Sequence, residues 1–212
     1  MISEKLMLAV LVSGRGSNLQ AIIDNIENDD LPAKIALVIS NVKNAFALER
    51  ARRHKIECLF LDPKSYPDRN RYEKALVENI QSKSVDLVCL AGFMRILGKY
   101  FIDAFSGRII NIHPSLLPAF PGVNVQKQAL EHGARFSGCT VHYVNEEVDA
   151  GPIILQAVVP IYDADDEASL SERILEQEHT IYPEAIRLIA EGRLTFSGRR
   201  VLQNRKFIGP NV

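Results

Sequence analysis

Apolar residues along the chain fall into short runs, and segments with helical spacing separate them. Seven runs of strand length stand out, at 6–12, 34–40, 57–61, 85–90, 108–112, 139–144 and 153–161. The first, second and fourth are almost continuously apolar, which is typical of parallel strands covered on both faces. Helical periodicity predicts helices at 18–27, 45–54, 69–82, 96–105, 125–132 and 169–191.

This alternation predicts an α/β fold with a mostly parallel, twisted sheet and helices on both faces, a Rossmann-like arrangement. Ligands then bind beyond the carboxyl ends of the strands, where the strand order reverses. We find no internal repeat and no linker, so we expect one domain over 1–212. Ser169 and Glu172 have the spacing of a capping box and predict the start of the last helix there.

Composition and charge exclude several classes of protein. The formal net charge of −1 gives no footprint for nucleic acid. No apolar run approaches the roughly 20 residues that span a bilayer, and the start of the chain lacks the regions of a signal peptide. The three cysteines are single and widely spaced, so we expect reduced, buried thiols in a cytoplasmic protein. The histidine spacing predicts no metal site.

The turn after the first strand reads Ser13-Gly-Arg-Gly-Ser-Asn18. Two glycines let the backbone turn tightly, and the following helix start favours an anion, so we expect a phosphate there. A plain helix N-cap would favour the same residue types and stays open as an alternative. A dinucleotide site is not indicated, because Leu19 stands where the third glycine of that motif belongs.

Asn111 and His113 lie two positions apart at the end of a predicted strand, so both side chains point to the same side. Pro114 keeps His113 out of helical geometry and fixes the imidazole. An amide donor beside an imidazole suits a developing oxyanion, and the imidazole can also move a proton near neutral pH. A structural turn with a satisfied histidine is the alternative.

Asp149 precedes a small-Gly-Pro turn between two predicted strands. A carboxylate there can lie close to His113 and favour its charged form. An acidic surface hairpin explains the same residues. No pattern in the residues by itself joins Asp149 to His113.

Four motifs together resemble one family. They are Ser13-Gly-Arg-Gly-Ser-Asn18, Ala91-Gly-Phe-Met-Arg-Ile-Leu97, Asn111-Ile-His-Pro-Ser-Leu-Leu-Pro118 and Asp149-Ala-Gly-Pro152. In this order, over about 8–192, they are similar to the phosphoribosylglycinamide formyltransferase family, the folate-dependent glycinamide ribonucleotide transformylases of purine synthesis. The third motif is shared by a wider formyltransferase superfamily, and the first is much more specific.

The resemblance implies transfer of a formyl group from 10-formyltetrahydrofolate, a co-substrate, to the amine of phosphoribosylglycinamide. It implies a phosphate-binding half at 1–105, a catalytic and folate-binding half at 106–192, and a tail at 193–212 that it does not explain. It assigns catalysis to Asn111, His113 and Asp149. It assigns the substrate to Gly16, Ser17, Asn18 and Glu178. The folate site it implies consists of Arg69, Met94, Arg95, Ile96, Leu97, Asn111, Asn145, Glu146, Glu147 and Val148.

Glu178 also falls within an apolar helical stripe, where a carboxylate needs a partner. The substrate's amine is one candidate, and an internal pair with Arg173 or Arg187 is the other. His142 either lines the folate side or is structural. The chain departs from some family members at Asn124 and Leu175, which concerns peripheral contacts only.

Three rivals stay open. Methionyl-tRNA formyltransferase shares the His-Pro-Ser-Leu-Leu-Pro stretch, but we expect it to need an RNA-binding domain for which this chain has no room. Formyltetrahydrofolate hydrolase is similar in its core, behind an extra regulatory domain. A non-catalytic sugar-nucleotide binding module would not need the three catalytic residues together. We expect small-molecule partners only, without nucleic acid or membrane, and a homodimer is compatible with the sequence.

Overall fold

The computed structural model describes residues 5–204; residues 1–4 and 205–212, the two ends of the expected domain, lie outside the described residues. The main sheet contains β1 (Leu6–Val12), β2 (Ala33–Ser40), β3 (Cys58–Phe60), β4 (Leu87–Leu90), β5 (Ile109–His113), β6 (Phe136–Tyr143) and β7 (Ile153–Pro160). The helices are α1 (Ser17–Glu27), α2 (Phe46–Arg53), the 3-10 helix η1 (Pro63–Ser65), α3 (Arg69–Gln81), α4 (Lys99–Ala104), α5 (Val125–Glu131) and α6 (Glu167–Ala190). A separate hairpin follows, β8 (Leu194–Ser197) and β9 (Arg200–Gln203).

The strand order in the main sheet is β3-β2-β1-β4-β5-β6-β7. Strands β1 to β5 pair in parallel, and β6 runs antiparallel to both of its neighbours. The order reverses between β1 and β4, and in such sheets this is the point where ligands bind. The predicted α/β class with a mostly parallel sheet is therefore confirmed.

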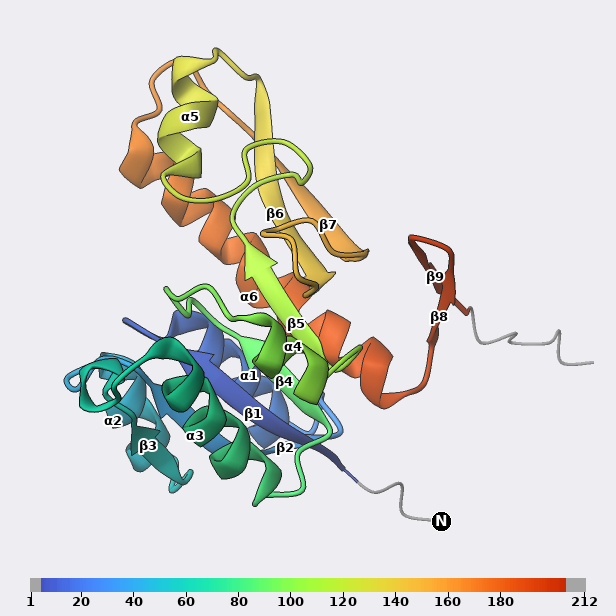
Figure 1. The fold of residues 1–212 in the computed structure, drawn as a ribbon. Helices are drawn as coiled ribbons and strands as arrows, with labels where there is room; N and C mark the ends of the chain where they lie inside the picture. Colours follow the sequence, from blue (N-terminus) through green and yellow to red (C-terminus); the bar gives the residue numbers. More distant parts are fainter. Residues whose placement is uncertain (1–4, 205–212) are drawn as a thin grey trace, which may run out of the picture.

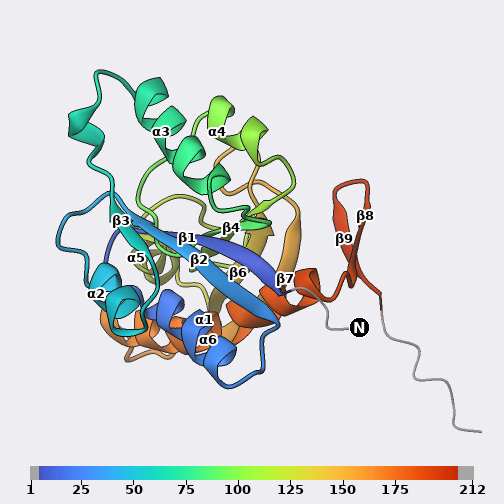
Figure 2. The same cartoon turned by 90° about the horizontal axis from the view of Figure 1, so that it is seen from below.

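Helices cover both faces of the sheet, as Figure 2 shows: α1, α2 and α6 lie below it in that view, and α3 and α4 lie above it. Alternation along β1 explains its continuously apolar sequence. Leu8 and Val10 pack into the cluster that contains α1 and α6, whereas Ala9 and Leu11 pack into the cluster that contains α3 and α4.

Two predicted helix starts were wrong. The last helix begins at Glu167, because Asp166 caps it: the Asp166 carboxylate accepts from the Ser169 amide at 2.8 Å, and the Ser169 hydroxyl accepts from the Asp166 amide at 3.1 Å. Ser169 is thus the closing residue of the capping box, not its first. Helix α4 begins at Lys99 rather than at 96, which leaves 91–98 as a loop after β4.

The hairpin β8–β9 lies near the end of α6, beside the rest of the fold (Figure 1). Leu194 and Val201 pack against the core cluster that contains α6. Among residues 5–204, no helix combines the length and the apolar character that crossing a membrane requires.

Candidate active site

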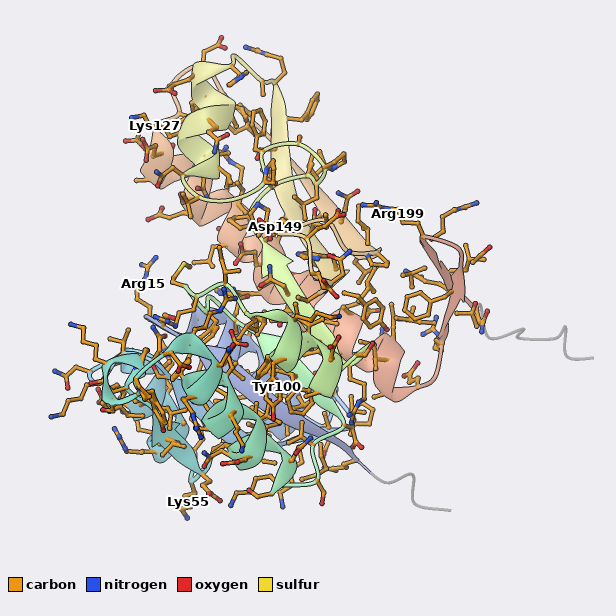
Figure 3. The ribbon with its side chains drawn as sticks, viewed as in Figure 1. Arg15, Lys55, Tyr100, Lys127, Asp149 and Arg199 are labelled. Carbon is orange, nitrogen blue, oxygen red and sulfur yellow. The ribbon has the colours of Figure 1, made fainter. Side chains whose placement is uncertain are left out.

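Three segments that follow parallel strands meet at one edge of the sheet: the turn 13–16 after β1, the loop 91–98 after β4, and the end of β5 at His113. A fourth segment, 144–152, joins β6 to β7. Its base is closed by a hydrogen bond from the Tyr143 amide to the Pro152 carbonyl, at 2.9 Å. Figure 3 labels Arg15 in the first of these segments and Asp149 in the last.

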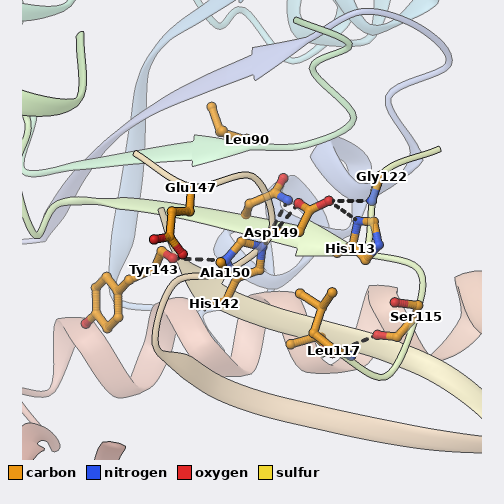
Figure 4. Close-up of polar contacts among 12 residues, drawn as sticks. Leu90, His113, Ser115, Leu117, Gly122, His142, Tyr143, Glu147, Asp149 and Ala150 are labelled. Atoms are coloured by element: carbon orange, nitrogen blue, oxygen red, sulfur yellow. Dashed lines mark hydrogen bonds and ion pairs between the residues drawn. The ribbon is translucent and has the colours of Figure 1, made fainter. Parts of the chain in front are cut away.

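The side chains of His113 and Asp149 face each other (Figure 4), with 3.5 Å between His113 Nδ1 and Asp149 Oδ2. They are thus within the reach that the sequence analysis expected, although 36 positions separate them in the chain. His113 is only 5% exposed, and its Nε2 lies 3.1 Å from the Phe120 carbonyl oxygen. Asp149 Oδ2 also accepts from the Gly122 amide at 2.8 Å. The Asp149 side chain is only 12% exposed and is held by these contacts. Its neighbours Glu146 and Glu147 are exposed in the connection between the antiparallel strands β6 and β7, so the alternative of an acidic surface hairpin describes them and not Asp149.

Asn111 lies beside His113 on β5 and is held by a residue of the neighbouring strand. Residues 111 and 142 are directly paired across β5 and β6, and the Asn111 amide nitrogen lies 3.2 Å from His142 Nε2. His142 Nδ1 lies 2.9 Å from the Tyr143 carbonyl, so Nδ1 donates there and Nε2 accepts from Asn111. Burial lowers the pKa of His142, although the Tyr143 carbonyl and Asp149 oppose this. A neutral ring at pH 7 fits this hydrogen-bond pattern.

Asn111, His113, His142 and Asp149 thus form a compact polar group. In this group Asp149 lies between His113 and His142 (Figure 4). Asp149 Oδ1 lies 3.8 Å from His142 Nε2, a pairing that would matter only if that ring were charged. The Asp149 carboxylate therefore interacts mainly with the imidazole of His113. Such a group can stabilise an oxyanion through the amide and the imidazole, and it can move a proton through the imidazole.

The turn after β1 presents backbone amides, not a side-chain cap. Gly16 is the N-cap residue of α1, with φ of 70°, and no side chain caps this helix within the described residues. The Ser17 and Asn18 amides belong to the first turn of α1, where no preceding carbonyl can accept from them. The turn thus supplies the N-cap of α1, as that alternative stated, but at Gly16 and not through the side chain of Ser17 or Asn18. The side-chain amide of Asn18 points to Glu178.

Glu178 is 7% exposed, and its Oε2 accepts from the Asn18 side-chain amide at 2.7 Å. The proposed arginine partners are bound elsewhere, Arg173 to Asp165 and Arg187 to Glu184. An internal pair with either arginine is therefore wrong. Burial raises the pKa of Glu178 to about 7, while the hydrogen bond from Asn18 lowers it. This carboxyl lies beside the start of α1 and changes its charge near neutral pH.

The residues that the sequence assigned to the folate site lie in two loops. Arg69 reaches the first loop, where its Nη2 donates to the Ile96 carbonyl at 2.8 Å. Met94 and Ile96 are exposed, whereas Leu97 is buried in the core, so the Leu97 side chain cannot line a surface site. Arg95 lies over the ring of Tyr72.

The second loop contains Asn145, Glu146, Glu147 and Val148. The Glu147 amide donates to the Asn145 side chain at 3.2 Å, and Val148 is exposed. Lys99 Nζ lies 2.6 Å from Glu146 Oε1 and so links this loop to the end of the first one. The structure therefore brings the two loops together.

Sequence reasoning missed two residues that organise the first loop. The Ser13 hydroxyl donates to Asn41 Oδ1 at 2.5 Å and accepts from the Met94 amide at 2.8 Å, which joins the glycine turn to the loop. Glu73, almost fully buried, accepts from Arg69 Nε and from the Gly98 amide, both at 2.7 Å. The signal available in the sequence was that Glu73 falls within the apolar stripe of the predicted helix 69–82, where a carboxylate needs a partner.

No group of three or more His, Cys, Asp or Glu side chains is placed to hold a metal ion anywhere from residue 5 to residue 204. A separate hollow lies at the amino ends of β1 and β2, away from these loops. Its lining includes Met7, Glu27, Lys34, His54, Glu57 and Lys83. Opposite charges pair within it, as Lys83 and Glu57 do at 2.7 Å, so it offers no concentrated charge for a ligand.

Comparison with known proteins now decides the family. The sequence model described as "Formyl transferase" matches residues 6–186. The chain belongs to the formyl transferase family. All the candidate catalytic residues of this formyl transferase, and Glu178, fall within the matched range, whereas the hairpin β8–β9 falls outside it.

Three individual relatives support this family assignment. Phosphoribosylglycinamide formyltransferase of Escherichia coli (strain K12) is 46% identical over 187 residues, which cover 88% of each chain. The crystal structure of glycinamide ribonucleotide transformylase 1 from Symbiobacterium toebii superposes with a TM-score of 0.94 at 53% identity, covering 95% of each chain. The trifunctional purine biosynthetic protein adenosine-3 of Drosophila pseudoobscura pseudoobscura is 50% identical over 201 residues, 94% of this formyl transferase but only 14% of that relative's length.

Proposed function

We propose that this formyl transferase moves a formyl group from 10-formyltetrahydrofolate to the amine of phosphoribosylglycinamide, a step of purine biosynthesis in the cytoplasm. The observation that carries the proposal is the juxtaposition of Asn111, His113 and Asp149 at the carboxyl edge of the sheet. The relatives named for this reaction, at 46% to 53% identity, support the choice of substrates.

The substrate phosphate binds to the backbone amides of Gly16, Ser17 and Asn18, where the helix start favours an anion. Glu178 receives the glycinamide amine. A carboxyl whose pKa is about 7 ionises readily at neutral pH and can then accept a hydrogen bond from that amine. The first half of the chain, 1–105, thus supplies the phosphate site.

The folate lies between the two loops, against Arg69, Met94 to Leu97, Asn111 and the backbone of Asn145 to Val148. The exposed apolar side chains of Met94, Ile96 and Val148 offer contacts for its rings. Leu97 contributes through its backbone, since its side chain is in the core. The segment 106–192 thereby holds the catalytic residues and the second folate loop.

In the reaction, the amine nitrogen attacks the formyl carbon directly, so no covalent enzyme intermediate forms. Negative charge develops on the formyl oxygen, and the Asn111 amide and the His113 imidazole stabilise it. The bond from the formyl carbon to the folate nitrogen then breaks, and a proton passes from the amine to that nitrogen with the help of His113. The Asp149 carboxylate offsets the positive charge that the ring carries while it holds the transferred proton. Its 3.5 Å separation from His113 suits this role.

The test is absorbance-monitored formyl transfer with the purified chain, which is offered phosphoribosylglycinamide, initiator tRNA or water alone as the acceptor. We expect turnover with phosphoribosylglycinamide and none with tRNA. Release of formate without an acceptor would point to a formyltetrahydrofolate hydrolase, and binding of both ligands without turnover would point to a non-catalytic module. Size measurement of the same sample tests whether the protein is a homodimer.

A further inference from the structure

The hairpin β8–β9 contacts the segment that carries Asp149. Arg199, in the turn of the hairpin, donates from Nη2 to the Ala150 carbonyl oxygen at 2.6 Å. Ala150 directly follows Asp149 in the chain. Figure 3 labels Arg199 at the end of the hairpin that reaches toward the main body. A residue beyond the range matched by the family is thus bonded to the backbone next to a candidate catalytic carboxylate.

A second contact holds the hairpin to the other end of the same segment. The rings of Phe196 and Tyr143 lie 5.0 Å apart, and Tyr143 is the last residue of β6, just before the segment begins. Leu194 and Val201 pack on the core at the base of the hairpin. The hairpin is therefore fixed at its base and its middle, and Arg199 projects from a supported turn.

The backbone at Asp149 needs such support. Its φ of 52° lies in the left-handed region, which residues other than glycine adopt at a cost. Gly151, two residues later, approaches the Tyr143 carbonyl so closely that a Cβ there would lie 1.7 Å from its oxygen. The Gly122 amide holds the Asp149 side chain, and Arg199 holds the carbonyl that follows it.

We propose that Arg199 is a positioning residue that holds the segment 144–152 in the conformation in which Asp149 faces His113 and the second folate loop is in place. This inference rests on the proposed function for the roles of Asp149 and of that loop. Arg199 acts through the Ala150 carbonyl and does not touch substrate. The hairpin β8–β9 therefore connects the segment 144–152 to the end of α6.

The experiment compares Arg199→Ala with Arg200→Ala in the full chain. Both arginines are exposed and adjacent in the sequence, and both changes remove one positive charge. For Arg199→Ala we expect kcat to fall about 5-fold and KM for 10-formyltetrahydrofolate to rise about 5-fold, which corresponds to about 1 kcal/mol each. The effect is modest because an exposed hydrogen bond competes with water. KM for phosphoribosylglycinamide and the Tm should hardly change, and Arg200→Ala should match the wild type.

Hydrogen exchange of the backbone amides supplies a readout that needs no activity. In Arg199→Ala the amides of 145–151 should exchange faster than in the wild type, while those of β1 and β4 stay protected. If Arg199→Ala changed neither the exchange rates nor the kinetics, the proposal would be wrong. The hairpin would then only pack against the core. A lower Tm with equal rises in both KM values, or equal losses in Arg200→Ala, would overturn it too. A wild-type chain without transferase activity would instead refute the proposed function, and the exchange measurement would still decide the contact.

Discussion

His113 and Asn111 are each held by a group outside the proposed chemistry. The Phe120 carbonyl lies at one nitrogen of His113, and the His142 ring accepts from Asn111. The Asn111 amide has a second N–H for the oxyanion and does not have to reorganise when charge develops. His113 has to exchange one of its present partners, Phe120 or Asp149, for the oxyanion. The alternation along β5 was sufficient to predict that these two side chains share a side. The support from His142 was not predictable, because it depends on the register between β5 and β6.

Replacing His113 tests this role most directly. We expect His113→Ala to lower kcat about 10³-fold or more, with little change in substrate binding, because a donor to the oxyanion acts only as charge develops and is worth roughly 3–4 kcal/mol. Steady-state kinetics with both substrates measures this. If the variant kept a tenth of the wild-type kcat, His113 would be a structural residue of the turn at 114–122.

At the scale of elements, the fold follows from periodicity, and the helix starts follow from local contacts that periodicity does not contain. The seven predicted strands and six predicted helices each match an observed element to within a few residues, whereas η1 and the hairpin β8–β9 were not predicted. Helix α4 starts late because its N-cap, Gly98, is bound through its amide to Glu73 of another helix. Asp166, not Ser169, caps α6 for a related reason, since both residues can serve as caps and only the structure shows which one does.

The glycine turn at the start of α1 sets a limit on how the phosphate site can be tested. A Cβ on Gly16 would lie 2.5 Å from the Cβ of Ala47, and the φ of 70° is unfavourable for other residues. A larger residue at position 16 would therefore shift α2 and disturb more than phosphate binding. Substitution of Gly16 is for this reason not a selective test of phosphate binding.

Ser17→Ala is the cleaner change at this element. It removes the Ser17 hydroxyl, which can donate to the phosphate beside the backbone amides, and it leaves those amides and the turn intact. A hydrogen bond to a charged group is worth roughly 1.5–3 kcal/mol, so KM for phosphoribosylglycinamide should rise about 10-fold or more. KM for 10-formyltetrahydrofolate should stay within about 2-fold, which serves as the internal control. If the KM values for both substrates rose together, the assignment of the phosphate site to this turn would be wrong.

At the scale of the whole molecule, the hydrogen bond from Asn18 to Glu178 joins α1 to α6 across 160 positions of sequence. The apolar stripe around Glu178 predicted a buried carboxylate, but nothing in the sequence alone indicated Asn18 as its partner. Such a contact arises only once α1 and α6 pack on the same face of the sheet. Because this contact joins two helices of the core, the protonation state of Glu178 affects the free energy of unfolding of the whole protein.

The pKa of Glu178 leads to a prediction about stability and pH. Burial raises this pKa from its ordinary value of 4.5 to about 7 in the folded protein. Between these two values the folded state holds a proton that the unfolded chain has lost, so the stabilising contribution is present at low pH and is lost as pH rises toward 7. The shift corresponds to at most about 3 kcal/mol. Glu178→Gln keeps the shape and removes the titration. The variant should therefore be more stable than the wild type at pH 8, by up to about 3 kcal/mol.

Urea unfolding of wild type and Glu178→Gln at pH 5 and pH 8 measures this difference, which should shrink at pH 5, where the wild-type carboxyl is protonated in the folded state. The same variant should bind phosphoribosylglycinamide about 10- to 150-fold more weakly, because a neutral amide replaces the carboxylate that receives the amine. Calorimetric titration with each ligand separates the two effects, and folate binding should be unchanged. Higher stability at pH 8 together with weaker binding of phosphoribosylglycinamide would show that Glu178 serves substrate binding and destabilises the folded state. A variant that is less stable at pH 8 and binds normally would make Glu178 a structural residue of the contact between α1 and α6.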